Sequence, residues 1–80
     1  GDVYKRQDSQ YAIFEVEIPE NWIGKNVGQL DIRKKYGINI LATRKYGKTD
    51  VAVSPETVLN GDATILVLGE YKAIQKCFRI

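Results

Sequence analysis

The chain has 80 residues, 44% of them hydrophobic, and its 12 Lys and Arg against 10 Asp and Glu give a formal net charge of +2. This length allows one domain at most, which buries little more than about 60% of its unfolded surface, so contacts with a partner would matter for its stability. The small net charge gives no reason to expect a nucleic-acid partner. Half of the cations fall between residues 33 and 48, where they form either a solvated basic face or a site for a compact anion.

The chain contains no histidine and a single cysteine, Cys77. An internal disulfide is therefore excluded, and so is a zinc site, which needs several nitrogen or sulfur donors around one metal. No apolar run approaches the roughly 20 residues that cross a bilayer. We expect a cytoplasmic chain with no cofactor and no direct membrane insertion, which reaches any membrane process from the aqueous side.

Residues 1–8 follow no period that continues into the next segment. They are predicted to be either a linker from a preceding domain or a non-native tail. The domain itself is predicted to span residues 9–80. We also expect the chain to be part of a longer protein.

The first element is predicted over residues 12–18, where the positions at even numbers alternate with those at odd numbers: Ala12, Phe14, Val16 and Ile18 against Ile13, Glu15 and Glu17. This period of two is typical of a strand with one core face, and Pro19 ends its ladder. Trp22 follows in a connecting segment, where it is expected to cover an edge of the core rather than to bind a ligand.

A helix is predicted from Asn26, which can cap it, to Gly37, which can take the left-handed conformation at its end. Gly28 and Asp31 weaken this helix, so we expect it to be bent or broken in two. The apolar run at residues 38–43 then predicts a second strand.

The second half of the chain predicts a hairpin, another strand and a closing helix. Turn chemistry at residues 46–48 precedes a third strand at residues 51–53, and the buried strand 64–68 is expected to end at Gly69. Tyr71, Ile74 and Phe78 are spaced as one face of an amphipathic helix over residues 70–79. The order β-α-β-β-β-α predicts an α+β domain, with a small single-layer sheet, mixed or antiparallel, and two helices.

Catalytic chemistry is not supported by this sequence, and we expect the protein not to be an enzyme. The carboxylates are scattered without a convincing pair, and no histidine is present to act as a base. Cys77 has no histidine to activate it, so a packed or idle thiol is favoured over a nucleophile. The glycines are spaced as turns and caps and form no nucleotide-binding fingerprint.

Several segments in succession resemble one known regulatory module, the TrkA-C or RCK_C domain of potassium-transport regulators. The resemblance covers Tyr11 to about Ile80 and is closest to the gating subunits of Ktr potassium-uptake systems. The matching segments are Phe14-Glu15-Val16, Ile18-Pro19, Trp22-Ile23-Gly24-Lys25, Leu30-Asp31-Ile32-Arg33-Lys34-Lys35-Tyr36-Gly37-Ile38-Asn39-Ile40, Pro55, Thr57-Val58-Leu59, Gly61-Asp62 and Ile65-Leu66-Val67-Leu68-Gly69-Glu70.

The resemblance implies a homodimer that binds cyclic di-AMP between its two subunits and, through the full-length protein, controls a membrane potassium channel or transporter subunit. It makes Arg33 a phosphate contact and Asn39 an adenine or backbone-positioning contact. Physical chemistry agrees, since a guanidinium forms planar hydrogen bonds to phosphate and branched aliphatic side chains can cover flat base faces. The implied apolar lining consists of Val27, Ile32, Ile40, Leu41 and Pro55.

Three alternatives remain open at this point. Ile32, Ile40 and Pro55 can be ordinary core or interface residues, and Asn39 can satisfy a neighbouring backbone group. The same module resembles domains of cation/proton antiporters and other transporters. It can also act as a dimerisation module without a ligand. Leu41 departs from the small residue expected at its position, which would narrow the pocket.

Overall fold

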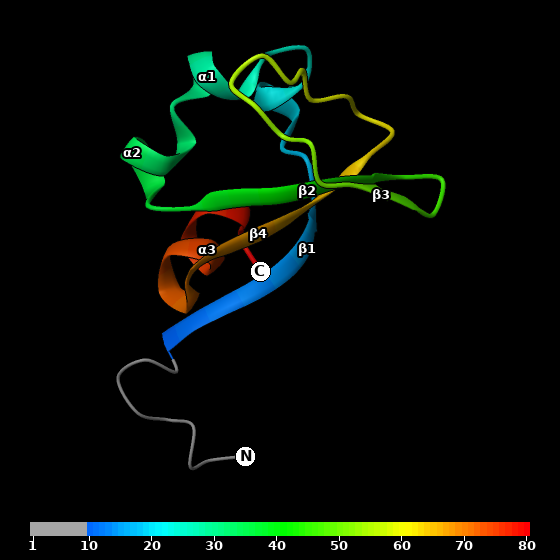
Figure 1. Ribbon diagram of the computed structural model, residues 1–80. Coiled ribbons are helices and arrows are strands. Elements are labelled where there is room, and N and C mark those ends of the chain that lie inside the picture. The colour runs from blue at the N-terminus through cyan, green and yellow to red at the C-terminus, as the bar shows by residue number, and fades with distance from the viewer. Residues whose placement is uncertain (1–9) are drawn as a thin grey trace.

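Four antiparallel strands form one sheet in the computed structural model, which describes residues 10–80 (Figure 1). The strand order in the sheet is β1-β4-β2-β3, so the first and last strands of the sequence pair with each other. The predicted tail at residues 1–8 and the predicted start at residue 9 lie outside the described residues. The strands are β1 (Tyr11–Glu17), β2 (Asn39–Lys45), β3 (Lys48–Asp50) and β4 (Thr64–Glu70).

Strand β1 has the two faces that its alternating sequence predicts. Phe14 and Val16 pack toward the core, whereas Ile13 and Glu15 lie on the opposite face and are exposed. Ile13 is paired with Leu68 of β4, so these two side chains share the face of the sheet that is turned away from the core. The 3-10 helix that follows β1 (Glu20–Trp22) buries Trp22 almost completely, as expected for a residue that covers the core.

The predicted central helix is broken in two, as its composition indicated. Helix α1 (Val27–Leu30) begins at a capping box, in which the Gln29 amide donates to Asn26 Oδ1 at 2.7 Å and the Asn26 amide donates to Gln29 Oε1 at 3.0 Å. Asp31 then adopts the left-handed conformation with φ 53°, and α2 (Ile32–Tyr36) starts in a new direction. Gly37 ends α2 with φ 71° and leads the chain into β2.

The hairpin after β2 is present, but the third strand does not lie where the sequence predicts it. Tyr46 and Gly47 alone form the turn, so pairing resumes at Lys48 and β3 ends at Asp50. Residues 51–53, predicted as the strand, lie outside any strand. The reason is local, because the Ala52 amide donates to Asp50 Oδ1 at 2.9 Å and turns the backbone out of the ladder.

Strand β4 continues through Gly69, which was expected to end it, and runs directly into α3 (Tyr71–Phe78). Helix α3 packs its Ile74 side chain, fully buried, against the sheet. Figure 1 shows α3 on one side of β2, and α1, α2 and the loop that leads to β4 on the other. The main core cluster consists of Val16, Ile18, Trp22, Ile32, Ile38, Leu59, Ile65, Val67 and Ile74.

The predicted α+β class and element order are confirmed, with the first helix counted as its two halves. None of the helices between residues 10 and 80 has the length and hydropathy to span a membrane.

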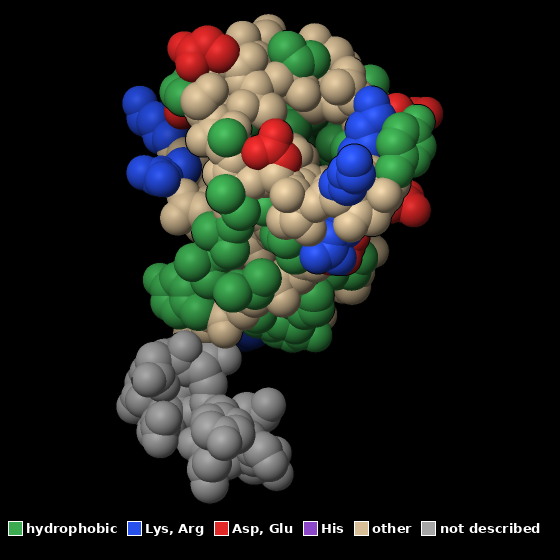
Figure 2. Space-filling model, turned by 45° about the vertical axis from the view of Figure 1, so that its right-hand side comes forward, with side chains coloured by type: hydrophobic (Ala, Val, Ile, Leu, Met, Phe, Trp, Pro, Cys, Tyr) green, Lys and Arg blue, Asp and Glu red, His purple; other side chains and the backbone are tan. Residues whose placement is uncertain are grey.

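Hydrophobic side chains gather over the lower part of the described face in Figure 2, while lysine and arginine side chains lie nearer its edges.

Candidate functional site

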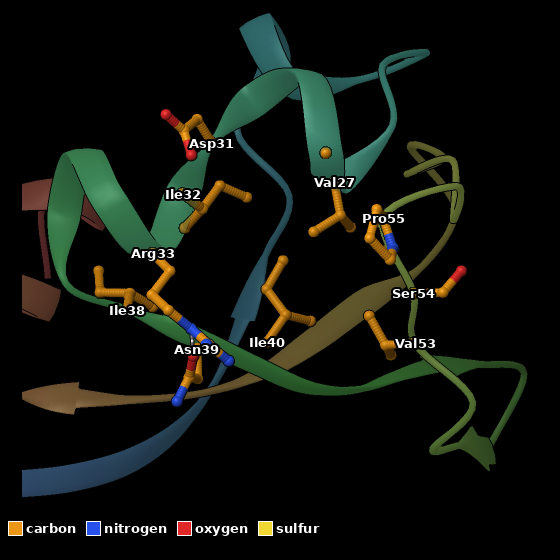
Figure 3. A pocket seen from close by; sticks show the side chains of 11 residues that line it. Val27, Asp31, Ile32, Arg33, Ile38, Asn39, Ile40, Val53, Ser54 and Pro55 are labelled. Atoms are coloured by element: carbon orange, nitrogen blue, oxygen red, sulfur yellow. Dashed lines mark hydrogen bonds between the residues drawn. The ribbon is translucent and has the colours of Figure 1, made fainter.

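A pocket of about 310 Å³ opens between α1, α2, the start of β2 and the loop at residues 53–55 (Figure 3). Sequence segments that are distant from one another therefore meet at this point. Six of the seven residues that the resemblance implied line the pocket. They are Val27, Ile32, Arg33, Asn39, Ile40 and Pro55.

Leu41 is the seventh and does not line the pocket. The register between β2 and β4 shifts between Ile40 and Ala42, so Leu41 lies in a bulge of the strand. Leu41 is 39% exposed, whereas Ala42 is buried. Within a single copy of the chain, Leu41 thus faces solvent rather than the pocket.

Five further residues line the pocket that the sequence did not single out. Val53 and Ser54 precede Pro55 in the chain, and Ile38 precedes Asn39. Only this adjacency to predicted site residues could have pointed to them in the sequence. Gly28 and Asp31 were noted for their effect on the helix and not as site residues. The complete addition is Gly28, Asp31, Ile38, Val53 and Ser54.

Backbone hydrogen bonds fix the loop against α1 and so set the width of the pocket. The Gly28 amide donates to the Pro55 carbonyl at 2.8 Å, and the Val27 amide donates to the Thr57 carbonyl at 2.9 Å. The Gln29 amide donates to Asn26 Oδ1 in the capping box, so all of the amides in the first turn of α1 already have a hydrogen-bond acceptor. They are not available to an anion, although helix N-termini often bind one.

Among the described residues that line the pocket, Arg33 is the only lysine or arginine, and Asp31 is the only acidic residue. The Arg33 Nε donates to Asn39 Oδ1 at 2.6 Å, which is the one hydrogen bond of this guanidinium within residues 10–80. Figure 3 shows the Arg33 and Asn39 side chains meeting on one side of the pocket, with the Asp31 carboxylate away from them. Among residues 10–80, no side chain or backbone group binds the terminal guanidinium nitrogens, which face an anion in the pocket without competition from these residues.

Apart from Asp31 and Ser54, the rest of the pocket lining is apolar. In Figure 3, Val27, Val53 and Pro55 lie on the side opposite Asn39, and Ile40 lies between them and Asn39. Ile32 is 2% exposed and belongs to the main core, so it forms the floor of the pocket while it also supports the fold. This arrangement of one guanidinium beside aliphatic walls suits a ligand that combines phosphate with a flat base.

A second concavity of about 960 Å³ lies between the 3-10 helix, α2 and α3. It combines Trp22 and Phe78 with cationic and acidic side chains at its rim, including Lys35 and Glu20. Cys77 also lines it, and burial raises the pKa of this thiol. Residues 10–80 hold no cluster of His, Cys, Asp or Glu that would suit a metal ion.

The comparison with known proteins identifies the family. Residues 12–80 match the family described as the TrkA-C domain. The chain is also 27% identical over 67 residues to the Ktr system potassium uptake protein A of Bacillus subtilis (strain 168). That alignment covers 84% of this chain and 30% of the relative, so the chain spans less than a third of the curated protein that it matches.

Solved structures share the fold. The RCK C domain of the potassium transport protein KtrA, in complex with cyclic di-AMP, is 24% identical, with a TM-score of 0.78 over 88% of this chain and 82% of that chain. The RCK_C domain dimer of S. agalactiae BusR, also with cyclic di-AMP, is 25% identical, with a TM-score of 0.68 over 85% and 96%. The GsuK channel bound to NAD is 24% identical, with a TM-score of 0.74 over 88% and 13%.

These matches agree with one another in family and fold. The family is one of regulatory domains in transport systems and is not an enzyme family. The match covers nearly all of the described residues, from β1 to the end of α3. The chain therefore belongs to the TrkA-C domain family.

Proposed function

We propose that this chain is the regulatory ligand-binding domain of a potassium transport system, which binds cyclic di-AMP at a homodimer interface and thereby controls channel gating. The observation that carries the proposal is the convergence of Arg33, Asn39 and an apolar wall on one pocket. Two structural relatives, from KtrA and BusR, are complexes with cyclic di-AMP. The potassium-uptake relative in Bacillus subtilis indicates the transport process.

The charge of the pocket supports binding between two copies. Cyclic di-AMP carries two phosphates related by two-fold symmetry, whereas each pocket contributes one guanidinium, that of Arg33. Two copies around a two-fold axis would give each phosphate its own arginine. The site is therefore completed by a second copy of the chain, and the BusR relative is a dimer.

Exposed apolar side chains provide surface for this second copy. Tyr11 and Ile13 are 59% and 60% exposed, on the face of β1 turned away from the core. Leu41 is also exposed, and in the sequence it directly follows Asn39 and Ile40, which line the pocket. We propose that Leu41 acts only in the dimer, where its side chain covers the ligand or the partner subunit.

Control of gating requires the ligand to favour one arrangement of the dimer. A ligand that bound both arrangements equally would shift no equilibrium, however tightly it bound. We propose that the domain works on the cytoplasmic side, peripheral to the membrane, through a full-length protein that contacts a potassium channel or transporter subunit. Loss of potassium uptake on binding is the expected direction.

Thermal unfolding of the 80-residue chain with and without cyclic di-AMP tests the proposal. At a free ligand concentration of about a hundred times Kd, binding adds about 2.7 kcal/mol per site, shared between two subunits. The midpoint should then rise by several degrees. Cyclic di-GMP and ATP serve as ligand controls. Arg33→Ala should greatly reduce the rise, whereas Lys34→Ala, which removes a neighbouring cation outside the pocket, should preserve it.

The oligomeric state separates this proposal from the dimerisation module without a ligand. Light scattering should show a dimer whose Tm rises with cyclic di-AMP. A dimer whose Tm is unchanged by all three nucleotides, with Arg33→Ala identical to the parent chain, would contradict ligand binding and leave assembly as the function. The residues that precede this chain in the full-length protein distinguish a channel regulator from an antiporter domain.

A further inference from the structure

Arg33 and Asn39 come from two different elements but meet in one hydrogen bond. Arg33 lies in α2 and Asn39 is the first residue of β2, with the left-handed Gly37 between them. The bond joins Arg33 Nε to Asn39 Oδ1 at 2.6 Å. Because Nε can only donate, the Asn39 side chain must present its oxygen to Arg33.

We infer that Asn39 is a positioning residue for Arg33, and that it acts on the phosphate of the ligand through the guanidinium. This inference rests on the proposed function, and it adds how the Arg33 guanidinium is oriented before the ligand binds. A bond at Nε fixes the plane of the guanidinium, and within residues 10–80 neither terminal nitrogen has a partner. With Nε engaged, those two nitrogens are the pair that can bind a phosphate in bidentate fashion.

The first test needs no ligand and uses the NMR signal of the Arg33 Nε–H group in the free 80-residue chain. Arg44 provides an internal reference, because its Nε donates to Thr49 Oγ1 at 2.9 Å, away from the pocket. In Asn39→Ala, the Arg33 signal should exchange faster with water and move toward the position of a free arginine, while the Arg44 signal stays unchanged. An unchanged Arg33 signal would overturn the inference.

The second test is a double-mutant cycle on the affinity for cyclic di-AMP. Asn39→Ala should weaken binding about tenfold or more, as for loss of a hydrogen bond to a charged group. Because Asn39 acts through Arg33, the double variant Arg33→Ala/Asn39→Ala should bind no more weakly than Arg33→Ala alone. Lys34→Ala should bind like the parent chain.

Two results of the cycle would count against the inference. If the two losses multiply, Asn39 contacts the ligand independently of Arg33, and its positioning role is wrong. If Asn39→Ala binds like the parent chain, the hydrogen bond has no role in binding. A parent chain that is folded, shows the expected Arg33 signal and binds no cyclic di-AMP would overturn the proposed function, and with it the role of Asn39 toward this ligand.

Discussion

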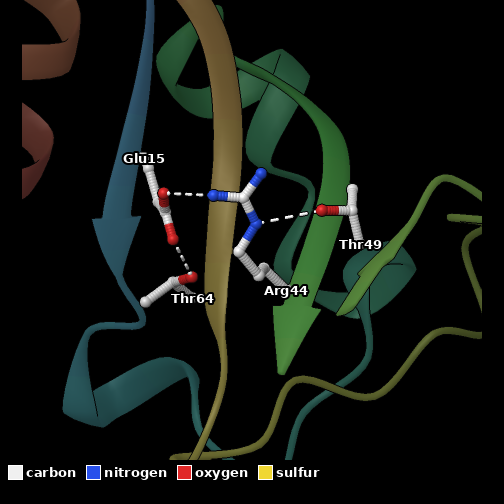
Figure 4. Close-up of polar contacts among 4 residues, drawn as sticks. All are labelled: Glu15, Arg44, Thr49 and Thr64. Atoms are coloured by element: carbon white, nitrogen blue, oxygen red, sulfur yellow. Dashed lines mark hydrogen bonds and ion pairs between the residues drawn. The ribbon is translucent and has the colours of Figure 1, made fainter. Parts of the chain in front are cut away.

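Arg44 and Glu15 form an ion pair across a strand that separates them. The Arg44 Nη1 lies 2.8 Å from Glu15 Oε1, although β1 and β2 do not pair with each other, since β4 runs between them. Thr64 of β4 donates its hydroxyl to the other Glu15 oxygen at 2.6 Å, and Arg44 Nε donates to Thr49 of β3 at 2.9 Å. One network thus touches all four strands (Figure 4).

Glu15→Gln should lower the free energy of unfolding by about 0.5–1 kcal/mol, the range of partly exposed ion pairs. Both side chains are about 40% exposed, at 40% and 38%, so solvent screens the charges and added salt should reduce the difference from the parent. Chemical unfolding at low and high salt measures this. Glu17→Gln is the matched control, because Glu17 lies on the same face of β1 and forms no ion pair within residues 10–80. Equal losses in the two variants would contradict a specific role for the network.

Tyr46→Asn should stabilise the β2–β3 hairpin by about 0.5 kcal/mol or more, because the native turn holds a non-glycine residue in the left-handed region. Tyr46 has φ 52° and Gly47 has φ 77°, the pair of positive values for which Asn-Gly is preferred. Tyr46 is 83% exposed, and the centroid of its ring lies 5.5 Å from Lys45 Nζ, so little packing is lost. Thermal unfolding should show a higher Tm, with the affinity for cyclic di-AMP unchanged. A lower Tm would show that the contact with Lys45 outweighs the turn preference.

The displaced third strand shows where sequence patterns fail in this fold. Strand β3 consists of Lys48, Thr49 and Asp50, all polar and exposed, so it carries no hydrophobic signal. Val51 has the composition of a strand residue but is 76% exposed. The two-residue turn decides the position of β3, whereas β1 and α3 are predictable because their hydrophobic periods coincide with burial.

The candidate site was predictable only in part, for a related reason. Arg33 and Asn39 follow from the resemblance, since they lie in one continuous matching segment. The contribution of Val53 and Ser54 depends on the bond from the Gly28 amide to the Pro55 carbonyl, which joins distant segments. No local pattern encodes such a contact, and it became visible only in the folded chain.

Cys77 should react slowly with iodoacetamide in the folded chain. Burial raises the pKa of its thiol, so at any pH below that value the folded chain contains less thiolate than the unfolded chain. The rate of alkylation should therefore rise with pH, and its midpoint should lie higher in the folded chain than in urea. A folded-state rate equal to the rate in urea at pH 8 would contradict this prediction.

Gly28→Ala should change the width of the pocket and leave the stability of the fold nearly unchanged. A Cβ at Gly28 would lie 3.1 Å from both the Cβ and the carbonyl oxygen of Pro55, so the loop at residues 53–57 must move outward by a few tenths of an ångström. Alanine is favoured over glycine in a helix by about 1 kcal/mol, which offsets the strain of this displacement. We expect a free energy of unfolding within about 1 kcal/mol of the parent chain, and an affinity for cyclic di-AMP that is several-fold weaker.

Gly61→Ala is the matched control for this prediction. Its Cβ would also be crowded, at 3.2 Å from Ile23 Cδ1, but it lies outside the pocket and meets the end of a flexible side chain. Affinity should therefore stay at the parent value in this variant. Calorimetric titration of both variants measures the difference. If Gly28→Ala binds as tightly as Gly61→Ala, the contact between α1 and Pro55 does not set the width of the binding pocket, and the ligand must rely on Arg33 and the second subunit alone.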